Sequence, residues 1–292
     1  TYGEASDVLG YDIASLSFED PKAEINLTRF TQPALLTHEI ACYRVFTEMT
    51  ENKLTPRMAA GHSLGEYSAL VAAGVLSFEL GLSLVKKRGE LMGEFGEGEM
   101  EALMIDLKSA TTLAEEHYCG LAACNLPEQN VVGGRPEDLD RLAASMAKKF
   151  PRKRSARLKT EGAFHTYYMV EAARRFREIL EKTDFQMPTF DVLSNFTGAM
   201  HESDLDSIRS RLFLQLFNPV LWHKNLVTAF EQGADVLIEF GGGLGKGTTA
   251  GEKRPNLESI VKKTFRGSDS APAYHAVINQ QTLDDTVAVF SE

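Results

Sequence analysis

The sequence has few cysteines, a single tryptophan and no long apolar run. Its three cysteines, Cys42, Cys119 and Cys124, are an odd number without the paired spacing of a zinc site, so we expect neither disulfides nor a bound metal. No apolar run approaches the roughly 18 residues that cross a bilayer, and no signal peptide opens the sequence. These absences predict a cytoplasmic protein that does not contact membranes.

Positive charge is also scarce. Lysine and arginine number 31 against 41 aspartates and glutamates, and the resulting net charge of -10 argues against general nucleic-acid binding. With 43% hydrophobic and 25% charged residues, the composition is that of an ordinary globular protein. A length of 292 residues allows one large α/β domain, alone or with a smaller domain inserted in it.

The pattern of strands and helices divides the chain into two kinds of segment. Between residues 99 and 163, short units follow one another in the order βαββαβ, which is typical of a ferredoxin-like unit. On either side, longer units predict a mostly parallel sheet covered by helices. We therefore predict an α/β protein with a large domain of residues 1–98 and 164–292 and a small subdomain of residues 99–163. The large domain's predicted strands cover residues 57–63, 190–195 and 234–240. Its predicted helices cover residues 32–49, 66–74, 77–92, 167–182, 204–217 and 220–232.

One short stretch suggests a nucleophile. In Gly61-His62-Ser63-Leu64-Gly65, a serine lies between two glycines, after a predicted strand and before a predicted helix. This arrangement is typical of a nucleophile elbow, in which a tight turn exposes the serine at the positive end of a helix. An ordinary turn serine is the alternative.

A serine nucleophile needs a base, and the sequence offers seven histidines. His62 is adjacent to Ser63 but should point to the opposite side of the turn. His165 lies where the chain returns from the predicted small subdomain, next to a helix start, and this position favours the cleft between domains. An ordinary structural histidine is the alternative for His165.

An arginine interrupts an apolar helix face. Leu80, Leu84, Arg88 and Met92 recur at every fourth position of the predicted helix 77–92. Either the stem of Arg88 lies along the core and its head reaches solvent, or its guanidinium is kept for a substrate carboxylate, which it can bind with two parallel hydrogen bonds.

Five motifs together resemble one family. The runs GHSLGEYSALVAAG, KKRGELM, ACNLPEQNVVGG, GAFH and QLFNPVLWHKNL occur in the same order and at similar intervals in the malonyl-CoA:acyl carrier protein transacylases and the acyltransferase domains of polyketide synthases. The resemblance extends from about residue 27 to residue 247. It implies an α/β-hydrolase-like large domain interrupted by a ferredoxin-like subdomain.

The resemblance also implies roles for particular residues. Ser63 would be the nucleophile and His165 its base, with the backbone carbonyl of Gln215 orienting the imidazole. The N–H of Leu64 is the expected oxyanion donor. Arg88 matches the arginine that binds the malonyl carboxylate. Further residues expected to line the substrate site are His62, Asn125 and Phe164, whose ring would leave little room for an α-methyl group.

The implied activity is transfer of a malonyl group from malonyl-CoA to the pantetheine thiol of an acyl carrier protein, through a malonyl-serine, in fatty-acid or polyketide synthesis. No cofactor is implied beyond the coenzyme A thioester substrate. A thioester hydrolase that clears acyl groups from carrier proteins is the main alternative, and a non-catalytic scaffold is a second. A basic run that includes Lys148, Lys149, Arg152, Lys153 and Arg154 is either a docking site for the acidic carrier protein or a solvated face.

The family opens with a strand and a GQGSQ loop, whose glutamine N–H is a second oxyanion donor. The printed sequence starts at Thr1, a point that the family reaches after this loop. If the protein itself lacks the loop, we expect a half-built oxyanion hole and a rate about 100- to 1,000-fold lower.

Overall fold

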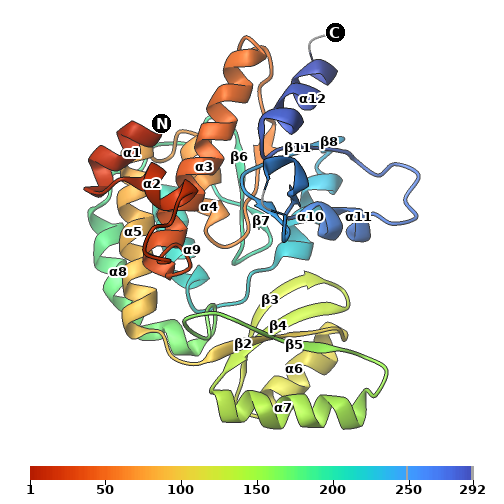
Figure 1. Cartoon of the computed structure of the whole chain (residues 1–292). Coiled ribbons are helices and arrows are strands. Elements are labelled where there is room, and N and C mark those ends of the chain that lie inside the picture. Colours follow the sequence, from red (N-terminus) through yellow and green to blue (C-terminus); the bar gives the residue numbers. More distant parts are fainter. Residues whose placement is uncertain (248, 291–292) are drawn as a thin grey trace.

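The computed structural model describes residues 1–247 and 249–290. Figure 1 shows two parts: one with many helices around small sheets, and one with a four-stranded sheet that carries two helices on one face. None of the described helices is long and apolar enough to cross a membrane.

Helices dominate the first part, which we call the large part. Two of the predicted helix starts are confirmed by side-chain caps. Ser77 Oγ accepts from the N–H of Leu80 at 3.2 Å, and Asp204 Oδ2 accepts from the N–H of Ser207 at 2.9 Å. The helices are α1 (Tyr2–Leu9), α2 (Ile13–Phe18), α3 (Thr28–Met49), α4 (Gly65–Ala72), α5 (Phe78–Phe95), α8 (Val170–Lys182), α9 (Leu205–Gln215), α10 (Trp222–Glu231), α11 (Glu258–Thr264) and α12 (Gln280–Phe290), with short turns η1 (Tyr167–Met169) and η2 (Ala250–Glu252).

The strands of the large part are β1 (Met58–Ala59), β6 (Asp191–Ser194), β7 (Ala199–Met200), β8 (Val236–Phe240), β9 (Gly243–Leu244), β10 (Arg254–Pro255) and β11 (Ala273–Val277). In the described residues they form three small sheets, which differs from the predicted mostly parallel sheet. The pairs β1–β6 and β8–β11 are parallel, whereas β6–β7 and β9–β10 are antiparallel. The reversal at β7 follows from a tight turn, in which the N–H of Gly198 donates to Ser194 O at 2.9 Å.

The second part, which we call the small part, has the predicted βαββαβ order. Its four strands form one antiparallel sheet in the order β3-β4-β2-β5. Asp106 caps its first helix, and a proline opens the second, as expected for helix starts. The elements are β2 (Glu99–Leu103), α6 (Leu107–Glu116), β3 (Gly120–Leu126), β4 (Gln129–Gly134), α7 (Pro136–Lys149) and β5 (Ser155–Leu158).

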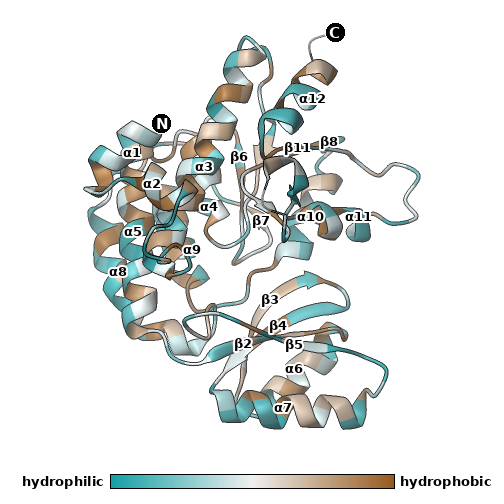
Figure 2. Cartoon of the chain, viewed as in Figure 1, coloured by the Kyte–Doolittle hydropathy of each residue, from teal (hydrophilic) through white to brown (hydrophobic). Residues whose placement is uncertain are grey.

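Apolar cores hold each part and join them. In Figure 2, α5, α7 and α8 carry both hydrophobic and hydrophilic residues, as expected of helices with one buried face. One apolar cluster joins the two parts. It lies between the small part's sheet and the helices α10 and α11, and it includes Val131, Ala122 and Trp222. The N–H of Cys124 also donates to Val220 O at 2.9 Å, so β3 lies against the segment that leads into α10. These contacts hold the sheet of the small part against α10 and α11.

Candidate active site

The chain makes a tight turn between β1 and α4, and Ser63 lies at its tip. The predicted strand over residues 57–63 is confined to β1, because the chain leaves the sheet before Gly61. A Cβ on Gly61 would lie 1.9 Å from the carbonyl carbon of Gly65, so only glycine fits there. Ser63 has a φ of 53°, in the left-handed region that non-glycine residues rarely adopt. This is the geometry of a nucleophile elbow.

The structure brings His165 to Ser63. Ser63 Oγ lies 2.7 Å from His165 Nε2, and His165 Nδ1 lies 2.7 Å from the backbone oxygen of Gln215. A carbonyl oxygen only accepts, so Nδ1 carries the proton and Nε2 is left to accept the serine proton. In this site a backbone carbonyl takes the place that an aspartate has in a Ser-His-Asp triad.

The imidazole of His165 is neutral over most of the pH range. Burial, aided by the charge of Arg88, lowers the pKa of His165 to about 3, and the hydrogen bond to Gln215 O opposes this shift only in part. Its side chain therefore stays free to accept a proton at neutral pH.

Arg88 comes from α5 and lies inside the protein. It is 1% exposed, so the interpretation in which its head reaches solvent is wrong. Nη1 donates to Gln32 Oε1 at 2.8 Å, and Nη2 donates to Gln215 Oε1 at 3.0 Å and to Ser63 Oγ at 3.2 Å. Burial lowers the pKa of Arg88, although a guanidinium keeps its charge in proteins. A buried cation therefore lies beside the nucleophile, with neutral oxygens as its acceptors.

The other predicted residues surround this centre. His62 Nε2 lies 2.9 Å from Asn125 Oδ1 of β3, and its ring meets Trp222 edge-on at 5.6 Å, so His62 joins the serine turn to the small part. Phe164 is partly buried and packs against apolar clusters from both parts. Leu64 is the N-cap of α4, where backbone N–H groups carry partial positive charge.

Several residues at the site were not singled out from the sequence. Asn195, which follows β6, accepts from Ser63 N at 2.6 Å and donates to Gly61 O at 2.8 Å, so it fastens both sides of the serine turn. Glu66 and Gln32 are buried beside Gln215 and Arg88. The position of Glu66, three residues after Ser63, was the one local signal that it lies near the serine.

The basic run is only partly free of acidic partners. Lys149 pairs with Glu116 at 2.6 Å, and Lys153 pairs with Glu128 at 2.7 Å. By contrast, Lys148, Arg152 and Arg154 are exposed and have no ion pair with the residues that the structure describes.

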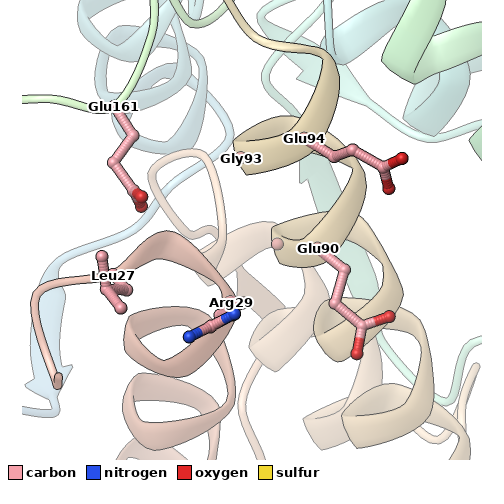
Figure 3. A pocket seen from close by; sticks show the side chains of 7 residues that line it. Leu27, Arg29, Glu90, Gly93, Glu94 and Glu161 are labelled. Carbon is pink, nitrogen blue, oxygen red and sulfur yellow. The ribbon is translucent and has the colours of Figure 1, made fainter.

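A cavity of about 490 Å³ lies between the N-terminal end of α3 and the C-terminal half of α5 (Figure 3). Its lining includes three glutamates and one arginine, and it contains neither Ser63 nor His165. The residues that line the cavity are Leu27, Arg29, Gly89, Glu90, Gly93, Glu94 and Glu161.

In residues 1–247 and 249–290, no group of three or more histidine, cysteine or acidic side chains has the arrangement of a metal site.

The sequence and the fold are similar to those of known proteins. The acyl transferase domain family matches residues 5–241. A malonyl CoA-acyl carrier protein transacylase of Bacillus subtilis is 38% identical over 100% of this chain and 88% of its own length, and one of Escherichia coli is 39% identical over 83% of this chain and 80% of its own. A type II PKS acyl-carrier protein in complex with its malonyl-transacylase is a structural match with a TM-score of 0.86 and 33% identity, covering 99% of this chain and 90% of the other.

Proposed function

Because the chain belongs to the acyl transferase domain family, we propose that it moves a malonyl group from malonyl-CoA to the phosphopantetheine thiol of an acyl carrier protein. The proposal takes its substrates from similar proteins named malonyl CoA-acyl carrier protein transacylase, and its setting is fatty-acid or polyketide synthesis. One observation in this chain carries it: the buried guanidinium of Arg88, 3.2 Å from Ser63 Oγ. This cation suits an acyl group that ends in a carboxylate.

The first half-reaction forms the acyl-enzyme. His165 Nε2 takes the proton of Ser63 as Oγ attacks the thioester carbonyl carbon. The tetrahedral intermediate then collapses, the carbon–sulfur bond breaks, and the imidazolium returns the proton to the sulfur of coenzyme A. The second half-reaction repeats these steps with the pantetheine thiol as the attacking group. Both intermediates carry an oxyanion, for which the N–H of Leu64 is the proposed donor.

The substrate site follows from the same geometry. Arg88 would bind the malonyl carboxylate and so hold the thioester carbon against Ser63 Oγ. We assign His62 and Asn125 to the wall of the cleft on the small part's side, where they bond each other. Phe164, adjacent to His165, would limit the space for an α-methyl group.

The finer features of the fold and the partner belong to the same proposal. We propose that residues 99–163 form a ferredoxin-like subdomain inserted in an α/β-hydrolase-like domain of residues 1–98 and 164–292. The exposed Lys148, Arg152 and Arg154 support docking of an acidic carrier protein on this subdomain. The cytoplasmic location expected from the sequence stays a prediction.

The test is to mix the protein with malonyl-CoA, methylmalonyl-CoA and acetyl-CoA in turn and to weigh it intact. We expect a malonyl adduct that forms faster than the other two and disappears when a carrier protein with a free pantetheine thiol is added. A thioester hydrolase would instead lose the adduct to water without the carrier protein. The lack of any malonyl adduct would contradict the proposed function.

A further inference from the structure

A buried carboxylate lies behind the serine and the arginine. Glu66 is in the first turn of α4 and is 0% exposed. Its Oε1 accepts from His201 Nε2 at 2.8 Å, and its Oε2 accepts from the N–H of Asn195 at 2.9 Å and from Gln215 Nε2 at 2.9 Å. A buried carboxylate without donors is costly, so these three hydrogen bonds allow Glu66 to stay inside.

Gln215 connects this carboxylate to the reacting groups. Its Nε2 donates to Glu66 Oε2 and also to Ser63 O at 2.9 Å, so both N–H groups of the amide are used. Its Oε1 is then left to accept from Arg88 Nη2 at 3.0 Å. The backbone oxygen of the same residue holds His165. One residue therefore contacts the nucleophile, the base and the arginine.

The charges on either side of the amide fix its orientation. An ionised carboxylate can only accept, and a guanidinium can only donate. If the Gln215 amide were flipped, its N–H groups would face the donors of Arg88 and its oxygen would face the acceptor Glu66. Both contacts would be lost, and Arg88 would be pushed from its place beside Ser63.

We infer that Glu66 is a positioning residue, which acts through the side-chain amide of Gln215 on Arg88 and Ser63, and that His201 holds its second oxygen. The inference rests on the proposed function, since the ligand of Arg88 is there the malonyl carboxylate. Glu66 would thus tune the preference for carboxylated acyl groups without touching the substrate.

A matched control separates positioning from stability. Glu101 of β2 is also a buried glutamate, 4% exposed, and it accepts from Arg157 Nε at 2.8 Å in the small part. Replacing either glutamate by leucine removes a buried hydrogen-bond acceptor from its donors, so both variants should lose stability. Only the change at Glu66 should alter the choice of acyl group.

The experiment measures loading rates with malonyl-CoA and with acetyl-CoA, by intact mass, at a temperature where circular dichroism shows each variant folded. Glu66→Leu should lower the malonyl-to-acetyl ratio about 10- to 100-fold, as expected for a lost hydrogen-bond partner of a charged group. Glu101→Leu should leave the ratio at the wild-type value. Glu66→Gln should keep most of the wild-type malonyl-to-acetyl ratio, because the new amide oxygen can still accept from Gln215 while the amide nitrogen faces His201.

A wild-type ratio in folded Glu66→Leu would overturn the positioning role while leaving the proposed function in place. A wild-type protein that forms no malonyl adduct would overturn both. Should Glu66→Leu fail to fold, His201→Phe removes only the bond to Oε1 and should lower the ratio less. An unchanged ratio in that variant would then overturn the inference.

Discussion

The two parts of the molecule treat buried charge differently. In the small part, each buried acid has an arginine partner: Glu101 accepts from Arg157, and Asp138 from Arg141. In the large part, the buried guanidinium of Arg88 donates to two amide oxygens and a hydroxyl. An ion pair cancels the charge of both partners, whereas the carboxylate that acts on Arg88, Glu66, lies across the amide of Gln215 and leaves the guanidinium able to bind an anion. The comparison indicates that the buried charge of the small part is structural and that of Arg88 is available to a ligand.

The strongest way to break this comparison is to remove the group that Arg88 faces. Ser63→Ala should abolish acyl-enzyme formation, because it removes the Oγ that lies 2.7 Å from His165 Nε2. The midpoint of thermal unfolding should change little, since the side chain lies at the tip of a turn. Intact mass after incubation with malonyl-CoA is the measurement, and an adduct of unchanged yield would refute the assignment of Ser63.

Arg88→Ala tests the comparison directly. If the guanidinium binds the malonyl carboxylate in a dry site, its removal leaves that carboxylate unpaired and should cost roughly 3 to 5 kcal/mol. Malonyl loading should therefore fall by about two to four orders of magnitude. Acetyl-CoA has no carboxylate, so its loading should hold or rise and the preference should invert.

Arg88→Lys is the control that keeps the positive charge at this position but lacks the planar guanidinium group. It should rescue malonyl loading only in part, because an ammonium group cannot reproduce the planar fork that contacts Gln32 and Gln215 together. If Arg88→Ala keeps the wild-type ratio of malonyl to acetyl adduct, Arg88 is structural and the hydrolase interpretation moves ahead.

What the sequence could predict depended on how local the signal was. Ser63 lies in a contiguous motif, and Arg88 breaks a helix stripe, so both could be found within one element. The spacing of Glu66 from Ser63 indicates only that the two are close. Its hydrogen bonds could not be predicted, since the donors His201, Asn195 and Gln215 come from segments about 130 to 150 residues away. Their contact depends on how α4, β6 and α9 pack, which no local pattern contains.

The fold shows the same limit. The βαββαβ order of the small part could be predicted because each unit is a complete strand or helix with a clear start. The helices α1 and α2 were not predicted, although Gly10, in the left-handed region with a φ of 77°, and the capping Asp12 are recognisable end signals. The strand β11 pairs with β8 from about 37 residues earlier, a contact that alternation alone does not reveal.

The buried imidazole predicts a pH dependence of stability. His165 has a pKa of about 3 when folded and an ordinary value near 6.5 when unfolded, so both states are neutral above pH 6.5. Below pH 6.5, His165 binds a proton in the unfolded state but stays neutral in the folded state. As the pH is lowered from 6.5 towards 3, the free energy of unfolding should therefore decrease, by up to about 1.4 kcal/mol per pH unit for this group.

The measurement is urea unfolding of the wild type and of His165→Gln at several pH values between 7 and 4. Contributions from other groups largely cancel in the difference between the two proteins. As the pH is lowered, the free energy of unfolding of the wild type should decrease more than that of His165→Gln. Parallel curves would show that His165 is not buried in the neutral form.

The smallest effect concerns exposed charge, where solvent and salt screen each interaction. Reversing Lys148, Arg152 and Arg154 to glutamate should slow malonyl transfer to the carrier protein by about 10-fold at low salt, because surface charges act mainly on the association rate. The paired lysines Lys149 and Lys153 supply the matched control. Their reversal should have less effect, since their charge is already offset by Glu116 and Glu128.

Self-acylation by malonyl-CoA separates docking from damage to the site. It should be unchanged in both sets of variants, because the basic run contributes no residue to the surroundings of Ser63. The transfer rate of the first set should also depend less on salt than that of the wild type. If the first set and the wild type transfer malonyl at equal rates at low salt, the basic run is a solvated face and not a docking site. A parallel fall in self-acylation would instead mean that charge on the small part reaches the serine, and the division between structural and available charge would fail.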